Sequence, residues 1–313
     1  MKSLKKICSC IVITICGGLF TIISSFAQQD AQYTQYMYNT VAINPAYAGS
    51  REVFNINSIY RAQWAGINGA PKTLTASLNT PVGQRGIGLG VSFFNDEIGP
   101  SQESNFAVDF AYRIRISNTT KLSFGLKGGF NLYNVNFTNS TLNYDPSDPN
   151  SADINNEFSP IIGLGAYLSS DKWYLGMSSP NLLETKHYND NVLVSTASEK
   201  ATFYFITGYV FTLNDTTQFK PAVLVKGTSG APLAINSSAN FLFNEKLMLG
   251  VAYSLDAAIS TLAGFQVSDQ IMIGYAYDYD TTDFSNYNSG SHEIVLRFEL
   301  ATTINKIINP RFF

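Results

Sequence analysis

The sequence predicts an all-β protein: a transmembrane, antiparallel, up-and-down β-barrel of about 14 strands that follows a cleaved signal peptide. Two observations predict this class. Apolar and polar residues alternate with a period of two in run after run, and tight turns alternate along the chain with much longer connections. The tight turns fall at residues 117–120, 169–172, 214–217, 244–246 and 268–270, and the longer connections at residues 136–158, 178–200 and 280–290. An outer-membrane barrel has short periplasmic turns and long extracellular loops, whereas a soluble sheet has no reason to separate them so regularly.

The first 27 residues are typical of a signal peptide. Three lysines precede a mostly apolar stretch at residues 11–23, and the small residues Ser25 and Ala27 frame a cleavage site. An uncleaved membrane anchor is the alternative, but the stretch is short for a spanning helix of about 20 residues and contains two glycines. We therefore expect a mature chain that begins at Gln28.

The composition of the mature chain excludes several functions. All three cysteines lie in the signal segment, at Cys8, Cys10 and Cys16, which leaves no disulfide and no thiolate metal site. The segment also holds three of the 20 basic residues and none of the 23 acidic residues, so 17 basic residues face 23 acidic ones and the mature net charge is −6. No basic patch of the kind that a nucleic-acid partner requires is present.

Fourteen alternating runs make up the mature chain. They start near residues 52, 72, 86, 102, 121, 158, 172, 201, 217, 233, 246, 259, 270 and 291. In one of them Leu122, Phe124 and Leu126 share a face. Because 14 strands are an even number, both termini are expected on the periplasmic side. Residues 51–313 then form a single barrel domain with a short C-terminal tail. Residues 28–50 precede the first strand, and the sequence leaves open whether they lie in the lumen or at the periplasmic mouth.

A soluble β-sandwich is the alternative to a barrel, since each apolar face could pack on a second sheet. Two arguments favour the barrel. So many strands in two sheets would leave edges to protect, and tyrosines recur at the ends of the apolar faces, as in the aromatic girdles of membrane barrels. These girdle candidates are Tyr60, Tyr112, Tyr133, Tyr167, Tyr209, Tyr253 and Tyr279.

The sequence offers no catalytic constellation. The chain has two histidines, His187 and His292, and the neighbouring Ser291 and His292 point to opposite faces of a strand, so they form no proton relay. Acidic clusters at residues 144–149 and 278–283 lack the spacing and glycine of a calcium loop. We predict a protein that is not an enzyme, with no cofactor and no metal site.

Charged residues recur on the polar faces of the predicted strands and are candidates for the lumen. The main candidates are Arg61, Asp109, Arg113, Lys127, Arg297 and Glu299, with Arg115, Lys220 and Lys226 as further ones. They could line a solute channel or form an ion-paired network that fills the barrel. We favour the filled interior.

Glycines and prolines mark the expected extracellular rim. They act as turn residues, or they shape ordered loops that bind another protein. The candidate partner-contact residues are Trp64, Gly69, Ala70, Pro71, Asn95, Asp96, Gly99, Pro100, Gly230, Ala231, Pro232, Ser291 and His292.

At these motifs the chain resembles the PorP/SprF family of outer-membrane proteins of the type IX secretion system. The resemblance extends over nearly the whole mature length. Its motifs are Gln32-Tyr33-Thr34-Gln35-Tyr36-Met37, Asn44-Pro45-Ala46-Tyr47-Ala48-Gly49, Tyr60-Arg61 with Gln63-Trp64, Gly69-Ala70-Pro71, Phe94-Asn95-Asp96 with Gly99-Pro100, Pro180-Asn181-Leu182-Leu183, Gly230-Ala231-Pro232, Gly274-Tyr275-Ala276-Tyr277-Asp278, Ser289-Gly290-Ser291-His292-Glu293 and Asn309-Pro310-Arg311-Phe312-Phe313.

The resemblance implies a Bacteroidota-type outer-membrane barrel without enzymatic activity. Family members are implicated in exporting or retaining surface proteins, among them large adhesins, including those of gliding motility, that carry a C-terminal sorting domain. The implied partners are such a client, other type IX secretion components and outer-membrane lipid. A porin-like solute channel is the alternative function, and a membrane-bound hydrolase is a third that the histidine geometry disfavours. The sequence identifies neither the client nor whether the protein serves the general machinery or one dedicated adhesin.

Overall fold

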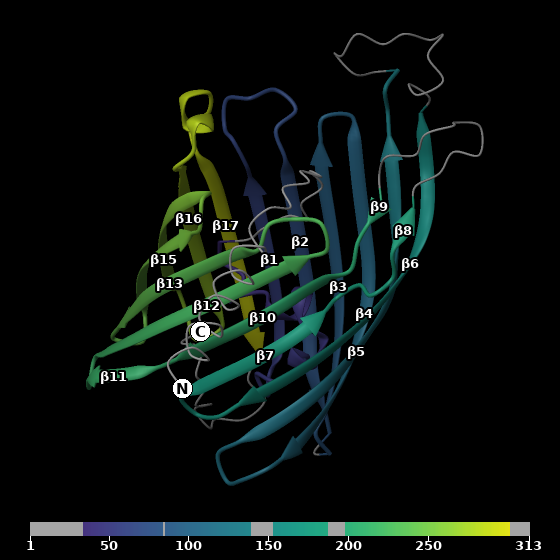
Figure 1. Cartoon of the computed structure of the whole chain (residues 1–313). Coiled ribbons are helices and arrows are strands. Elements are labelled where there is room, and N and C mark those ends of the chain that lie inside the picture. The colour runs from purple at the N-terminus through teal and green to yellow at the C-terminus, as the bar shows by residue number, and fades with distance from the viewer. Residues whose placement is uncertain (1–33, 84, 139–152, 187–197, 301–313) are drawn as a thin grey trace, which may run out of the picture.

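The wall of the protein is a closed antiparallel barrel (Figure 1). The computed structural model describes residues 34–83, 85–138, 153–186 and 198–300. Its strands are β1 (Phe54–Ala62), β2 (Lys72–Val82), β3 (Ile87–Ile98), β4 (Ser101–Arg115), β5 (Lys121–Val135), β6 (Ile154–Ser169), β7 (Trp173–Ser179), β10 (Thr202–Tyr209), β11 (Phe211–Asn214), β12 (Thr217–Thr228), β13 (Ala234–Phe243), β14 (Leu247–Ser254), β15 (Ala258–Gln266), β16 (Ile271–Asp280) and β17 (Ser291–Leu300). A separate hairpin pairs β8 (Thr185–Lys186) with β9 (Ser198–Glu199).

Each wall strand pairs with its sequence neighbours, and the first strand pairs with the last. The register of β1 and β17 runs from Phe54↔Leu300 to Ala62↔His292. Strands β10 and β11 both pair with β12 and together fill one position in the wall. The wall therefore has 14 strands, and the predicted up-and-down barrel is confirmed.

The connections separate into two ends. Loops at residues 63–71 and 281–290 lie at the top of Figure 1, and the turns after β2 and β4 lie at the bottom; we call these the long-loop end and the short-turn end. The alternation of short and long connections is less regular in the structure than the sequence predicted, however. At the long-loop end, Gly99 and Pro100 alone join β3 to β4, and residues 255–257 join β14 to β15. Left-handed backbone at Gly99 (φ 56°) and Asp256 (φ 54°) accompanies these tight reversals. Strand β1 starts and β17 ends at the short-turn end, whereas the termini lie outside the described residues.

The two faces of the wall have opposite polarity to those of a soluble protein. Large apolar side chains point outward and are exposed, such as Leu126 (56 %) and Leu296 (51 %), while Asn79 and Asp109 are fully buried inside. This inversion is what a lipid solvent demands, and it excludes the sandwich. Of the predicted girdle, Tyr167 is buried and faces inward, where its ring stacks 6.0 Å from Tyr174. Tyr133 lies on the same inward face of β5 as buried Asn131. The prediction that Tyr133 and Tyr167 belong to the girdle was therefore wrong. The other five tyrosines of the girdle are exposed.

The lumen is filled by the segment before the first strand, which we call the plug (residues 34–53). It contains a short helix, α2 (Thr40–Ile43), and a 3₁₀ turn, η1 (Pro45–Tyr47), and is drawn in purple inside the barrel in Figure 1. Its aromatic and aliphatic side chains, including Tyr36, Val41 and Tyr47, form the protein's buried apolar core with inward residues of the wall. Of the two placements that the sequence leaves open for residues 28–50, the part from residue 34 onward lies in the lumen.

Glycines on the inward faces of the strands make room for the plug backbone. A Cβ atom added to Gly125 would lie 2.1 Å from the Ala46 nitrogen, and one added to Gly88 would lie 2.0 Å from the Ala48 carbonyl oxygen. Neither distance is compatible with a side chain, so the wall contacts the plug backbone directly at these glycines. Within the described parts of the chain, no helix is long and apolar enough to cross a membrane.

Candidate functional site: the filled lumen and the long-loop rim

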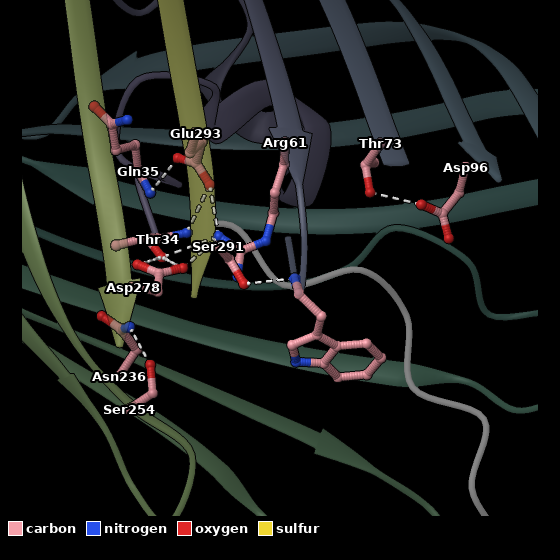
Figure 2. A network of polar contacts seen from close by, with 11 residues as sticks. Thr34, Gln35, Arg61, Thr73, Asp96, Asn236, Ser254, Asp278, Ser291 and Glu293 are labelled. Atoms are coloured by element: carbon pink, nitrogen blue, oxygen red, sulfur yellow. Dashed lines mark hydrogen bonds and ion pairs between the residues drawn. The ribbon is translucent and has the colours of Figure 1, made fainter. Parts of the chain in front are cut away.

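An ion-pair network fixes the plug at the long-loop end of the lumen (Figure 2). It is built on neighbouring strands: Arg61 near the end of β1, Asp278 near the end of β16 and Glu293 near the start of β17. The Arg61 Nη1 atom lies 2.6 Å from Asp278 Oδ2 and 3.2 Å from Glu293 Oε2. All three side chains are buried, and a buried charge is stable only when it is paired and hydrogen-bonded.

The first residues of the plug complete this network. The backbone N–H groups of Thr34 and Gln35 donate to the two carboxylate oxygens of Glu293 at 3.1 and 2.8 Å. The Thr34 hydroxyl also donates to Asp278 Oδ1 at 2.8 Å. Figure 2 shows these groups converging on one point between β16, β17 and β1. The carboxylates therefore bind the plug, and they also link β1 to its neighbours β16 and β17 where the first and last strands close the barrel.

A second ion pair holds the plug at the short-turn end. Arg51 binds Glu299 through two guanidinium nitrogens, and Nη2 lies 2.9 Å from Oε2. Asn55 donates to the same carboxylate at 2.7 Å, and Arg297 Nε lies 3.7 Å from it. Because Thr34 is anchored at one end and Arg51 at the other, the plug extends along the lumen from mouth to mouth.

Three more of the predicted luminal charges, Asp109, Arg113 and Lys127, also take part in ion pairs. Lys127 Nζ lies 2.8 Å from Asp109 Oδ1, and both side chains are almost fully buried. Arg113 Nη1 lies 3.6 Å from the carboxylate of Glu52, which follows the plug anchor at Arg51. The structure thus places all six main candidates, Arg61, Asp109, Arg113, Lys127, Arg297 and Glu299, in ion pairs of the lumen, whereas Arg115 is exposed at the end of β4.

Trp64 is held firmly at the long-loop rim. Its backbone has a left-handed conformation (φ 50°), which is strained for a bulky residue. The backbone N–H of Trp64 donates to the Ser291 hydroxyl at 3.1 Å. The indole packs edge-on against the Phe284 ring, with 4.9 Å between the ring centroids. Backbone bonds between Ala65 and the loop before β17, at 2.8 Å each, join the two loops. The rim therefore presents a half-buried indole in a fixed position.

The other predicted rim residues fall into two groups. Gly69 and Gly99 connect neighbouring loops, because the Gly99 N–H donates to the Gly69 carbonyl at 2.9 Å. Residues 230–232 occupy an exposed or half-buried turn. By contrast, Asn95 and Asp96 belong to β3, and Ser291 and His292 belong to β17. The expected placement of Asn95 and Asp96 in a loop was wrong, because the β3–β4 turn is only two residues long, whereas Ser291 and His292 begin the last strand, where the sequence predicted a run from about residue 291.

The neighbours Ser291 and His292 point to opposite faces, as expected for a strand. Ser291 is buried in the lumen, and the His292 ring lies on the outer side, 2.7 Å from the Tyr275 hydroxyl through Nδ1. They form no proton relay. The described residues also contain no group of three or more His, Cys, Asp or Glu side chains that could hold a metal ion.

The sequence reasoning missed the anchors on the plug, Thr34 and Gln35. The available signal was the run of glycines on polar strand faces, such as Gly163 and Gly165 or Gly88 and Gly90. Glycine has low strand propensity, so its repetition on one face indicates that another backbone lies close to that face.

The closed wall, the apolar exterior and the filled interior together define an outer-membrane β-barrel. A sequence profile described as type IX secretion system membrane protein PorP/SprF matches residues 25–298. The chain belongs to this family, and the resemblance inferred from its motifs is confirmed.

Solved structures with a similar fold are also outer-membrane barrels. The CymD monoaromatic hydrocarbon channel is 13 % identical, with a TM-score of 0.50, over 88 % of this chain and 94 % of that chain. The toluene transporter TodX of Pseudomonas putida is 10 % identical, with a TM-score of 0.48, over 83 % of this chain and 93 % of that one. No curated protein matches the sequence. At such low identities the likeness concerns the fold, and the family and the barrel place the protein in the outer membrane.

Proposed function

We propose that this protein is a non-enzymatic component of type IX secretion that supports the export or surface anchoring of a client protein, such as an adhesin with a C-terminal sorting domain, including the adhesins of gliding motility. The observation that carries the proposal is the plug. The chain's own residues fill the lumen from Thr34 at one end to Arg51 at the other, so the barrel offers its rim rather than its interior to a partner.

The filled lumen counts against the alternative, a porin-like solute channel. A channel needs a water-filled path, whereas Tyr36, Val41 and Tyr47 pack with wall residues in an apolar cluster across the interior. The charges that could line a channel are paired with each other or with the plug. Removing the plug would therefore require both ion-pair anchors to break.

The rim supplies the surface for a client. Extracellular loops of membrane barrels are longer than periplasmic turns, so we assign the long-loop end to the cell surface. There Trp64 is fixed in place by Ser291 and Phe284. Tryptophan is enriched among the few residues that carry most of the binding energy of protein interfaces, and a side chain that is already fixed costs less entropy to order on binding. Other type IX secretion components then have access to the short turns on the periplasmic side.

Deletion of the gene followed by surface proteomics tests the proposal. We expect at least one surface protein with a C-terminal sorting domain to disappear from the cell surface and to return on complementation with the wild-type gene. A deletion strain whose surface and secreted proteins are unchanged contradicts the proposed function.

Conductance of the purified protein in planar bilayers separates the proposal from the channel. We expect the wild-type protein to be silent, and a variant that lacks residues 34–50 to conduct, because the plug is the material that blocks the lumen. A large, steady conductance of the wild-type protein supports the channel instead.

A further inference from the structure

Neighbouring strands of the wall differ greatly in length between β6 and β7. Strands β4, β5 and β6 contain 15, 15 and 16 residues, whereas β7 contains seven. The ladder between β6 and β7 ends at Leu164↔Ser179 at the long-loop side. One further bond follows, from the Leu182 N–H to the Ile162 carbonyl at 2.7 Å. Residues 154–161 of β6 thus extend beyond the strand that should cover their edge.

The chain leaves this edge because it turns toward the lumen after β7. A Cβ atom added to Gly163, on the inward face of β6, would lie 2.4 Å from the Pro180 carbonyl oxygen. The Ser179 hydroxyl donates to the Asn181 carbonyl at 2.9 Å, and the Leu183 N–H donates to Asn181 Oδ1 at 3.1 Å. These local bonds stabilise a turn that takes the place of strand pairing.

Within the parts of the chain that the structure describes, the backbone of β6 therefore has unpaired groups at this edge. The Ile162 carbonyl faces the side of β7, and residues at intervals of two face the same side of a strand, so Phe158 and Pro160 do as well. Among the described residues, no backbone group pairs with these two positions on that side. A proline at position 160 is consistent with a free edge, because proline lacks an N–H and occurs in sheets at edges whose N–H side is unpaired.

The outer face at this edge carries a row of aromatic side chains. The Phe130 ring lies 5.9 Å from Phe106 on β4 and 5.8 Å from Phe158 on β6. The row ends at Phe158, which is 63 % exposed and whose side no strand among the described residues covers. On the inward face, Ser159 is buried. A strand added here would meet an apolar outer row and a buried inner face.

We propose that the uncovered edge of β6 at Phe158–Ile162 binds an extended segment of the client protein as an additional strand. This inference rests on the proposed function. Strand addition to a sheet edge provides main-chain hydrogen bonds and selects alternate side chains. The segment would donate N–H groups to the carbonyls of Phe158 and Pro160, accept the Phe158 N–H, and place an apolar or aromatic side chain next to the Phe158 ring.

Amide hydrogen exchange of the purified barrel tests the edge directly. The probe is the C-terminal domain of the client that disappears from the surface in the deletion strain. We expect the Phe158 amide to exchange rapidly in the free barrel and at least 10-fold more slowly with the domain bound, while the Leu126 amide, on a strand paired on both sides, stays protected throughout. Protection of Phe158 in the free protein, whether by another segment of this chain or by a second copy, overturns the inference without any client.

A pair of variants separates the backbone from the side chain. Phe158→Pro removes the N–H and the ring, whereas Phe158→Ala removes only the ring. We expect affinity for the client domain to fall at least 10-fold further in F158P than in F158A, with heat-modifiable migration of both barrels retained. If F158P does not assemble, the amide exchange of Phe158 in the wild-type protein decides whether the client adds a strand to this edge. A bound domain that leaves the Phe158 amide unprotected refutes strand addition while the proposed function stands, whereas a deletion strain that loses no client refutes the function itself.

Discussion

Arg61 and Glu293 lie directly opposite each other in the register of β1 and β17, and a 3.2 Å ion pair joins them across the seam that closes the barrel. The same Glu293 carboxylate accepts the backbone N–H groups of Thr34 and Gln35. One buried side chain therefore contributes both to the closure of the wall and to the retention of the plug. Both would respond to a single substitution.

We expect Arg61→Met to destabilise the folded barrel by about 3–5 kcal/mol, the usual cost of leaving a buried charge without its partner. The methionine keeps much of the side-chain volume but leaves Asp278 and Glu293 facing each other without a cation. The free energy of unfolding, measured by urea titration in lipid vesicles, checks this prediction.

The double variant Arg61→Met with Glu293→Gln is the control. Removal of one carboxylate relieves the repulsion, so the double variant should be more stable than R61M alone. If R61M unfolds at the wild-type urea concentration, the network contributes little to stability and the account of the seam is incorrect.

The contact between the wall and the plug can be tested at one glycine. Gly125→Ala would place a Cβ atom 2.1 Å from the Ala46 nitrogen and 2.4 Å from the Pro45 carbonyl carbon. Because both are backbone atoms, the plug must shift, at a cost of roughly 1–3 kcal/mol. We expect a lower midpoint of thermal unfolding and intermittent conductance in planar bilayers.

Gly128→Ala is the matched control. It lies three residues along the same strand, on the outer face, and an added Cβ would meet nothing within 4 Å. It should leave both the unfolding temperature and the silent bilayer record unchanged. If the two variants lowered the unfolding temperature equally, the change in strand propensity, rather than contact with the plug, would explain the lost stability.

Trp64 can be examined with two substitutions that treat its backbone differently. Both Trp64→Ala and Trp64→Gly remove the indole, but only glycine adopts φ 50° without strain. If the ring binds the client, both variants should weaken binding by about 2 kcal/mol, or roughly 30-fold. Flow cytometry of client display on whole cells, together with heat-modifiable migration of the barrel, checks this prediction. Normal display in W64G with reduced display in W64A would assign the residue a structural role in the loop.

The periodicity of the sequence was enough to predict the number and order of the strands. Each predicted run corresponds to one position in the wall, including the short β7, because residues that face lipid and residues that face the lumen must alternate wherever a strand crosses the membrane. The luminal ion-pair residues were predicted for the same reason. A charged side chain on the polar face of a membrane strand has only the interior to occupy.

The plug and the uncovered edge could not be predicted in this way. The placement of residues 34–53 depends on tertiary contacts between distant parts of the chain, such as Gly125 with Ala46. The glycines on the inward strand faces indicate that some backbone lies close to them, but they do not specify which segment it belongs to. The turn after β7 likewise depends on the contact of Pro180 with Gly163. Asn95 and Asp96 were misplaced for a simpler reason. Asn, Asp, Gly and Pro together are typical of a loop, but here only Gly99 and Pro100 form the turn.

We expect the base of the β5–β6 connection to be sensitive to acid through Asp153. Its carboxylate accepts the Thr138 hydroxyl at 2.8 Å and the N–H groups of Thr138 and Phe137 at 3.1 and 2.8 Å. These bonds, led by that of the Thr138 side chain, lower the pKa of Asp153 below its usual value. Since the folded pKa is the lower one, the stabilisation is complete above the unfolded pKa of about 3.9 and is lost as the pH falls through the folded pKa.

We therefore expect the Phe137 and Thr138 amides to be protected from hydrogen exchange at neutral pH and to lose protection only below about pH 4, as the pH falls toward the lowered pKa of Asp153. The variant Asp153→Asn lacks the negative charge, so its two amides should be less protected at neutral pH and should show little further change on acidification. Comparison of the two proteins at each pH removes the intrinsic pH dependence of exchange. Parallel loss of protection in wild type and D153N would assign the acid response to another group, because the asparagine cannot titrate in this range.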